Sequence, residues 1–368
     1  MTSKVSIVRC IDYDTTRVYD AVKRAVDSIG GIETFVKPGM KVLLKPNLLS
    51  ARPPEDGVDT HPEVVRAVVR LVKASGGTVK IGDSSAGYHK DPYEVFEISG
   101  MRKVADEEGA ELTPFIKSKF VDGFPIARQL FECDCHISIP KLKTHIMTVI
   151  TAALKNTYGT VTGLYKAECH SKAPKEEDFA GIVAKIHSIS KPQLNILDAV
   201  TSMEGDGPSS GTLRDTGIIM ASADAVAMDS CITKLIGLEP LDVMVTKEAY
   251  AMGLGEADIS MIEISGDDMK TFSMANFKLP QTLPIKYIPR GIVNTIASLV
   301  KFRPEIDRKV CRRCNLCKVA CPVSAIESDD NGYYIDYKKC IGCMCCHEVC
   351  PYRAIGVRRN MLTKMVWG

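Results

Sequence analysis

Two copies of one cysteine pattern constrain the C-terminal part of this chain more than any other feature of its sequence. The first copy runs from Cys311 to Pro322 and the second from Cys340 to Pro351, and each reads C-x2-C-x2-C-x3-C-P. Each copy is followed by Ala-Ile, so the repeat keeps a constant offset of 29 residues. Nine of the 14 cysteines lie between Cys311 and Cys350. Any fold of this region must bring two sets of thiols into equivalent positions.

This spacing is the signature of bacterial-type domains that hold two [4Fe-4S] clusters. Three cysteines of one copy can bind three corners of one cluster, and the fourth reaches the other cluster. The predicted ligand sets are Cys311, Cys314, Cys317 and Cys350 for one cluster, and Cys340, Cys343, Cys346 and Cys321 for the other. Zinc is the alternative, but a doubled run of this kind is not a usual zinc spacing. Cys345 has no counterpart in the first copy, and we interpret it as a thiol outside both sets. Residues 306–358 thus resemble a bacterial-type ferredoxin domain.

The composition narrows the class of protein. A length of 368 residues suggests more than one domain, and 45% hydrophobic with 25% charged residues is typical of globular chains. The net charge of +2 argues against a nucleic-acid binder. We find no apolar run long enough for a transmembrane helix, and residues 1–10 lack the features of a signal peptide. We therefore expect a cytoplasmic protein whose cysteines are metal ligands or free thiols.

The change in composition predicts three segments. These are an α/β domain that binds a substrate or partner over residues 1–270, a linker or docking segment over 271–305, and the ferredoxin domain with a C-terminal tail over 306–368. Residues 291–300 of the linker are moderately apolar but too few to span a bilayer. We favour docking on the larger domain over a membrane surface, because membrane-surface helices usually carry a richer basic face.

Apolar runs alternate with amphipathic stretches in the first 270 residues. Short apolar runs predict strands at residues 5–8, 42–44, 79–82, 137–139, 194–197 and 218–220. Helical spacing predicts helices over residues 19–29, 62–72, 148–154, 178–189 and 223–235, with Thr60 as the N-cap of the second. This alternation predicts an α/β fold, with a mostly parallel sheet covered by helices on both faces, beside a small α+β ferredoxin-like domain that carries the two clusters.

Polar residues follow five of the predicted strands. In a mostly parallel sheet, ligands bind beyond the carboxyl ends of the strands, so we expect these residues, including Asp224 after the last strand, to gather at one edge. Each residue alone could be a solvated lysine or a helix cap, but their coincidence favours a site. The candidates for binding a cofactor or ligand are Lys45, Asn47, Asp83, Ser84, Lys141, Lys143, Asn156, Asp198 and Asp206.

The stretch from Lys141 to Gly159 holds the candidates for catalysis. Lys141, Lys143 and His145 alternate, so they share one face if the backbone is extended. Lys155 closes an apolar stretch, where a buried ammonium would need an anion; the alternative is a charge at a helix C-terminus. We take Lys155 and His145 as the catalytic candidates, with His145 as a proton donor; the alternatives for His145 are a ligand or a satisfied core histidine, and the last is the commonest outcome for an isolated histidine. The glycine-rich loop around Asp206 does not match a dinucleotide fingerprint, so Asp206 contacts a metal or hydroxyl or belongs to a plain turn.

Several of these segments together resemble the family known as domain of unknown function 362. The segments are Lys45-Pro46-Asn47, Thr60-His61-Pro62, Gly82-Asp83-Ser84, Pro140 to His145, Lys155 to Gly159, Asp198-Ala199-Val200 with Glu204 to Pro208, and Asp224 to Asp229. The similarity spans residues 5–265, and members of the family often carry a C-terminal ferredoxin domain. The resemblance implies this architecture and a shared site for the lysine, histidine and aspartate groups, but it implies no reaction.

We therefore expect an iron–sulfur oxidoreductase of anaerobic metabolism. Its two [4Fe-4S] clusters would exchange low-potential electrons with an anionic substrate or cofactor bound at the lysine-rich edge. The alternatives are a non-catalytic electron carrier that docks on a partner enzyme, and a redox-sensing or assembly protein. The expected partner is a redox protein or a small anionic substrate, and not nucleic acid. A further organic cofactor is left open, because flavin sites often lack a short signature.

Overall fold

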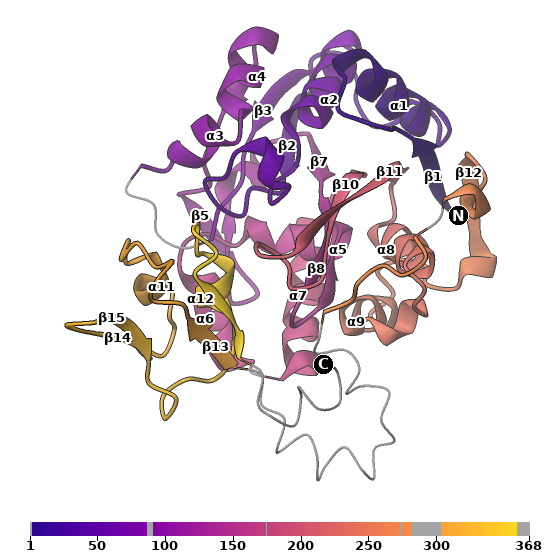
Figure 1. Ribbon diagram of the computed structural model, residues 1–368. Coiled ribbons are helices and arrows are strands. Elements are labelled where there is room, and N and C mark those ends of the chain that lie inside the picture. The colour runs from indigo at the N-terminus through magenta and orange to yellow at the C-terminus, as the bar shows by residue number, and fades with distance from the viewer. Residues whose placement is uncertain (1, 87–90, 174, 273, 281–302, 359–368) are drawn as a thin grey trace.

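The computed structural model describes residues 2–86, 91–173, 175–272, 274–280 and 303–358. The described residues before 281 form a large α/β unit, and residues 303–358 form a smaller unit that packs against one side of it (Figure 1). Residues 291–300, for which we expected docking on the α/β unit, lie outside the described residues. In the described part of the chain, no helix is long and apolar enough to cross a membrane.

Ten of the described strands of the α/β unit form one sheet, and β5 (Ser118–Val121) and β6 (Phe124–Ala127) form a separate antiparallel pair. The main path of the ten-stranded sheet runs in the order β12, β1, β11, β10, β7, β2, β3 and β4, while β8 pairs with β10 and β9 pairs with β8. The bounds are β1 Ser3–Arg9, β2 Lys41–Pro46, β3 Thr78–Ile81, β4 Glu111–Leu112, β7 Cys135–Ile139, β8 Lys141–His145, β9 Val149–Thr151, β10 Leu194–Glu204, β11 Thr212–Ser222 and β12 Ile262–Gly266. Most neighbouring strands run parallel, so the predicted mostly parallel sheet is confirmed.

Strand β11 runs antiparallel to both of its neighbours, β1 and β10. Strands β10 and β11 form a long hairpin, with Glu204 paired to Thr212 next to the connection. We expected Asp224, which follows β11, at the same edge as the other polar strand ends. That expectation is wrong, because an antiparallel strand ends at the opposite edge. Asp224 instead caps helix α8 (Ala225–Leu235), where its carboxylate accepts the N–H of Ala227 at 3.0 Å.

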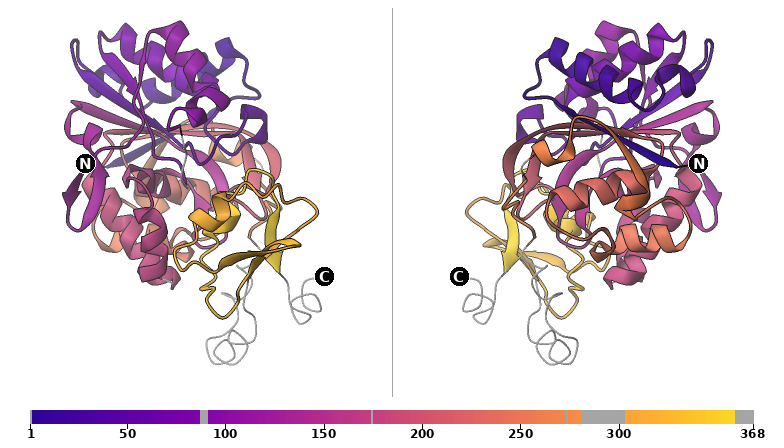
Figure 2. Two further views of the ribbon diagram at one scale, coloured as in Figure 1. Left: turned by 90° about the vertical axis from the view of Figure 1, so that its left-hand side faces the viewer. Right: turned by 90° about the vertical axis from the view of Figure 1, so that its right-hand side faces the viewer.

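Helices cover both faces of the sheet (Figure 2), as the sequence predicts. One face packs against α1 (Thr15–Asp27), α2 (Pro62–Ala74), α3 (Glu94–Ile98) and α4 (Met101–Glu108), and the other against α5 (Ala153–Asn156), α7 (Glu176–Ser190), α8 and α9 (Met244–Ala251). Helix α2 begins at the predicted residue, but its N-cap is His61 and not Thr60. The Thr60 hydroxyl instead accepts the N–H of Asn47 and donates to the carbonyl of Ile139, which fixes the end of β2 beside β7.

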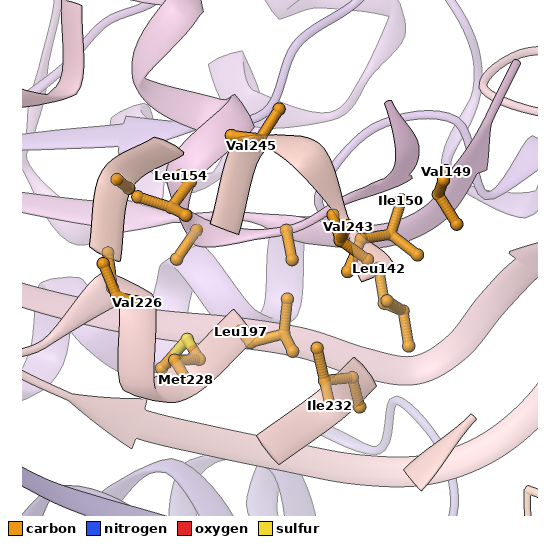
Figure 3. Close-up of a cluster of buried hydrophobic side chains, with 14 of the residues drawn as sticks. Leu142, Val149, Ile150, Leu154, Leu197, Val226, Met228, Ile232, Val243 and Val245 are labelled. Atoms are coloured by element: carbon orange, nitrogen blue, oxygen red, sulfur yellow. The ribbon is translucent and has the colours of Figure 1, made fainter. Parts of the chain in front are cut away.

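Hydrophobic side chains from several elements hold the region around β8 and α5 together. Figure 3 shows Leu142 of β8, Ile150 of β9, Leu154 of α5, Leu197 of β10 and Ile232 of α8 in one cluster. All five are almost completely buried. Burying a side chain of this size contributes roughly 1.5–3 kcal/mol, so the backbone that carries the candidate lysines and histidine is well anchored.

The predicted helix over residues 148–154 is wrong. Residues Val149–Thr151 form strand β9, which pairs antiparallel with β8, and helix α5 begins only at Ala153. The run Val149-Ile150-Thr151 is β-branched throughout, which favours a strand, and a short buried apolar run does not by itself distinguish helix from strand. The start of α5 is held by Asp229 of α8, whose carboxylate accepts the N–H groups of Ala153 and Leu154 at 2.7 and 3.0 Å.

The smaller unit repeats one structure twice. Strands β13 (Arg303–Ile306) and β16 (Ile355–Arg358) pair antiparallel, as do β14 (Ile326–Asp329) and β15 (Gly332–Ile335), and each half has one short helix, α11 (Leu316–Val319) or α12 (Cys345–Glu348). The backbone follows the 29-residue repeat of the sequence. Left-handed φ angles occur in three pairs of equivalent positions, Arg313 and Gly342, Asn315 and Met344, and Ser324 and Arg353. The two copies with the same cysteine spacing therefore also have the same backbone conformation at these positions.

Hydrogen bonds attach the smaller unit to the α/β unit. The guanidinium of Arg52 donates to the carbonyl of Cys350 at 2.9 Å, and the hydroxyl of Ser209 donates to the carbonyl of His347 at 3.0 Å. The Nε2 atom of His347 lies 3.2 Å from the carbonyl oxygen of Asp206. Arg52, Ser209 and His347 are all buried. These contacts place helix α12 next to the edge of the sheet at which β8 ends.

Candidate functional site

A cavity of about 80 Å³ lies between the edge of the sheet and helix α12. Seven of the predicted site residues line it, namely Asn47, Asp83, Ser84, Lys143, His145, Lys155 and Asn156. We call this cavity the interdomain pocket, because Cys345, Glu348 and Val349 of the smaller unit complete its wall.

Lys45 lies directly beside the pocket and holds its wall in place. Its completely buried ammonium lies 2.8 Å from Oδ1 of Asp83 and donates to Oδ1 of Asn156 at 3.1 Å. Asp83 in turn accepts the N–H of Leu48 at 2.7 Å. A Cβ atom at Gly159 would stand 2.6 Å from both the Lys45 ammonium and Asp83 Oδ1, so only glycine allows this close approach.

Lys141, Asp198 and Asp206 do not line the pocket, which corrects the expectation that all of the candidates converge. The Lys141 ammonium donates to Asp198 Oδ2 at 2.9 Å and to the hydroxyl of Tyr13 at 2.6 Å. The Tyr13 hydroxyl donates to Asp198 Oδ1 at 2.8 Å, and its ring stacks on His61 with the centroids 3.6 Å apart. These groups satisfy one another, so we assign Lys141 and Asp198 a structural role between β8 and β10.

Lys143 reaches the pocket from strand β8. Its ammonium is buried and donates to Oδ1 of Asn47 at 2.7 Å and to the carbonyl of Val58 at 2.6 Å. Burial lowers the pKa of Lys143, although the nearby carboxylate of Asp59 opposes this effect. Burial likewise raises the pKa of Asp59. The amide oxygen of Asn47 and the carbonyl oxygen of Val58 therefore already bind the Lys143 ammonium. These bonds fix the position of Lys143 and leave it less available to a ligand.

Lys155 is the cation in the pocket that has the fewest partners. Its Nζ atom lies 4.6 Å from the ring centroid of Tyr158 and 5.6 Å from that of Phe179. It makes no hydrogen bond and no ion pair with any residue that the structure describes. Burial lowers the pKa of Lys155, while the charge of Glu348 acts in the opposite direction. An ammonium held between aromatic faces without an acceptor is suited to binding an anion.

His145 has a defined protonation pattern. Its Nδ1 atom accepts the N–H groups of Met147 and Thr148 at 3.1 and 3.2 Å, so the proton of the neutral ring is on Nε2. Nε2 lies 3.1 Å from Oε1 of Glu348. This contact is poorly aligned, and neither atom has a well-formed hydrogen bond among the described residues. Burial lowers the pKa of His145, so the neutral ring presents a single N–H to the pocket.

The sequence did not reveal two pocket residues on helix α6 (Tyr165–Lys172). The Lys166 ammonium donates to Oγ of Ser84 and to the carbonyls of Ser84 and Ser85, and burial lowers its pKa to about 8. His170 stacks on Phe179 with the centroids 4.2 Å apart, and burial lowers its pKa to about 3. Lys166 and His170 are four residues apart and so share one helix face, which is the signal that could have identified them.

The two predicted sets of cysteines surround two separate cavities. The first is lined by Cys311, Cys314, Cys317 and Cys350, and the second by Cys321, Cys340, Cys343 and Cys346. In the described residues, no three histidine, cysteine or acidic side chains converge on a point that would hold a single metal ion. The thiols enclose a space instead, so the residues present fit a multi-atom cluster in each cavity. We call these spaces the first and second cysteine cavities.

Cys345 lies between the second cysteine cavity and the interdomain pocket and lines both. It is buried at the start of α12, and Glu348, one turn further along the same helix, also lines the pocket. The sequence marked Cys345 only as the cysteine without a counterpart in the repeat. Its position shows that the extra thiol faces the place where the two candidate sites are adjacent.

Comparison with known families gives two matches. Residues 42–234 match the family described as "Domain of unknown function (DUF362)", and residues 303–351 match a 4Fe-4S dicluster domain. The second match covers all eight predicted cluster ligands. The C-terminal unit is therefore of the iron–sulfur ferredoxin type, which supports a role in electron transfer.

Three similar proteins come from different organisms. Over 304 residues, the chain is 31% identical to a thylakoid-associated protein of Synechocystis sp., which covers 80% of this chain and 94% of that protein. Over 50 residues, it is 44% identical to pyruvate synthase subunit PorD of Pyrococcus furiosus, which covers 13% of this chain and 48% of PorD. The lactate racemase apoprotein of Thermoanaerobacterium thermosaccharolyticum aligns with a TM-score of 0.38 and 11% identity over 60% of this chain and 54% of that chain. The last similarity is too weak to support an inference.

Proposed function

The chain belongs to the family described as domain of unknown function (DUF362), and we propose that it is an iron–sulfur oxidoreductase. Its substrate is a small anionic compound held in the interdomain pocket. Two [4Fe-4S] clusters, one in each cysteine cavity, would supply one-electron transfer at low potential. The single observation that carries this proposal is that Cys345 lines both the second cysteine cavity and the pocket.

The charges in the pocket favour an anionic substrate. Lys143 and Lys166 are held by oxygen acceptors, and Lys45 is paired with Asp83, whereas Lys155 has no acceptor among the described residues. An ammonium without a hydrogen-bond acceptor in a partly buried site is stabilised by a negative group. Lys155 would therefore bind a carboxylate or phosphate of the substrate.

His145 would donate a hydrogen bond to the substrate next to that anion. The two backbone N–H groups that bind Nδ1 fix the ring orientation and keep the proton on Nε2. Nε2 faces the pocket together with Oε1 of Glu348. A neutral ring in this tautomer can donate a hydrogen bond from Nε2 to the substrate, but it does not release this proton, because the backbone N–H groups at Nδ1 cannot supply another.

Reoxidation of reduced protein tests the proposal. The protein is prepared without oxygen, reduced, freed of excess reductant, and mixed with compounds found bound to the purified protein and with a panel of small carboxylates and phosphates. The visible absorbance of the clusters should recover with at least one such compound, and recovery should slow in Lys155→Gln. Reoxidation by a partner protein alone would favour a dedicated carrier. Clusters that neither kind of acceptor reoxidises would favour a sensing or assembly role.

A further inference from the structure

The two cysteine cavities differ in what surrounds them. The second adjoins the interdomain pocket through Cys345. The first contains Cys314, which is the exposed member of the eight predicted ligands, whereas the others are buried or partly buried. One cavity therefore faces the candidate substrate and the other faces solvent. An electron carrier in solution would approach closest at Cys314.

The surface around Cys314 is basic. Lys309, Arg312, Arg313 and Lys318 are all exposed, and none of them forms an ion pair with an acid within the described ranges. The neighbouring Arg308 is paired with Asp329 at 3.1 Å, so these two charges offset one another. These four cations, which flank Cys314 in the sequence and lack a paired acid, are suited to steering partners of the opposite charge.

An apolar groove lies beside these cations. The groove has a volume of about 600 Å³ and runs from Cys314 and Leu316 of the smaller unit to Pro53 and Ile98 of the α/β unit. Its exposed apolar side chains include Val319, Tyr352 and Ile98. Asp56, which also lines it, already pairs with Arg52 and Arg353. An apolar centre with a charged rim is the composition of protein–protein contact surfaces.

We propose that the surface formed by Cys314, the four unpaired cations and the groove is the docking site of a small acidic one-electron carrier protein. The carrier is oxidised by one electron and the group held in the first cysteine cavity is reduced by one electron, with no proton transferred. This docking site rests on the proposed function, because an oxidoreductase of this kind needs a source of electrons. The groove lies on the side of the molecule that α11 occupies in Figure 1, away from α9.

Rapid mixing with a purified acidic two-[4Fe-4S] ferredoxin tests this docking site. The reduced ferredoxin is mixed with the oxidised holoprotein, and the second-order rate constant is followed by absorbance at several ionic strengths. We expect the rate constant to fall as salt rises, and to fall about tenfold in Lys309→Glu/Lys318→Glu at low salt. The matched control is Lys117→Glu/Lys247→Glu, which reverses two exposed lysines elsewhere and should react like the wild type.

The midpoint potentials of the wild type and the two double variants show whether a slower rate comes from weaker docking or from a smaller driving force for electron transfer. A rate constant that is independent of salt, that rises with salt, or that is equal in the two double variants would overturn the proposal. A potential shift large enough to explain the slower rate would overturn it too. Neither readout needs a substrate in the interdomain pocket, so failure of the proposed enzymatic function would leave this result unchanged.

Discussion

The carboxylate oxygen Oε1 of Glu348 lies 3.1 Å from the imidazole nitrogen Nε2 of His145. Glu348 belongs to helix α12 of the ferredoxin-type unit, and His145 ends strand β8 of the α/β unit. The two residues are 203 positions apart in the chain, and both are buried. The iron–sulfur unit is therefore one wall of the pocket in which the lysines of the α/β unit lie.

Replacing Lys155 should weaken anion binding. Lys155 lacks an acceptor among the described residues, so Lys155→Gln removes the cation most available to an anion. We expect the affinity for inorganic phosphate, measured by isothermal titration calorimetry, to fall at least about tenfold, which is about 1.4 kcal/mol. Lys247→Gln, an exposed lysine of α9, is the control and should bind like the wild type. Equal affinities in both variants would remove Lys155 from the site.

Cys345 should not be needed for iron. The wild type is expected to contain about eight iron and eight sulfide ions per chain, because two four-iron clusters are predicted. Cys345→Ser keeps both ligand sets and should retain this content, whereas Cys346→Ser should lose or convert one cluster. Iron and acid-labile sulfide analysis of anaerobic preparations measures both. The opposite pattern, with iron lost only in Cys345→Ser, would show that the assigned ligands are displaced by one residue.

Lys141 should matter for stability and not for ligand binding. Lys141→Met leaves the buried carboxylate of Asp198 without its cation, and breaking a buried pair in this way costs about 3–5 kcal/mol. We expect a lower urea midpoint for unfolding of the α/β unit and an unchanged phosphate affinity at low urea. If the variant is as stable as the wild type but binds phosphate weakly, Lys141 belongs to the site after all.

The stability of the α/β unit should depend on Asp229 and pH. Burial raises the pKa of Asp229 from 3.8 to about 7, although the N–H groups of Leu154 and Ala153 that bond to its carboxyl group oppose this effect. The folded protein then holds a proton that the unfolded chain releases, so folding stability falls as pH rises from about 4 to about 7. The free energy of unfolding of the wild type, relative to Asp229→Asn, should therefore decrease over this interval, by up to about 4 kcal/mol. Urea unfolding at several pH values measures this difference, and a constant or rising difference would contradict the assignment.

The cysteine ligands could be predicted because their spacing is local. All eight lie within 40 residues, and the 29-residue repeat determines which four share a cavity. The strand ends at Asn47 and Asp83 could be predicted as well, since buried β-strands have a clear apolar pattern, whereas Lys143 lies inside β8, a strand with too few apolar residues to be predicted.

The rest of the site depends on contacts between distant segments. The Lys141 ammonium donates to the hydroxyl of Tyr13 outside the pocket. Tyr13 is 128 positions away, and its sequence neighbourhood gives no signal for this role. Asp224 was misplaced because the direction of β11 depends on its pairing with β10 and not on its own sequence. Glu348 and Cys345 reach the pocket only because the ferredoxin-type unit docks beside β8.

The order in which the two clusters lose electrons tests the central claim most directly. Fully reduced protein is mixed with an anionic compound that reoxidises it, frozen after increasing delays and examined by electron paramagnetic resonance. The Cys346→Ser variant identifies the signal that belongs to the second cysteine cavity. We predict that this signal is lost first, because Cys345 joins that cavity to the pocket. Loss of the first-cavity signal before it, at a rate unaffected by Lys155→Gln, would contradict the account.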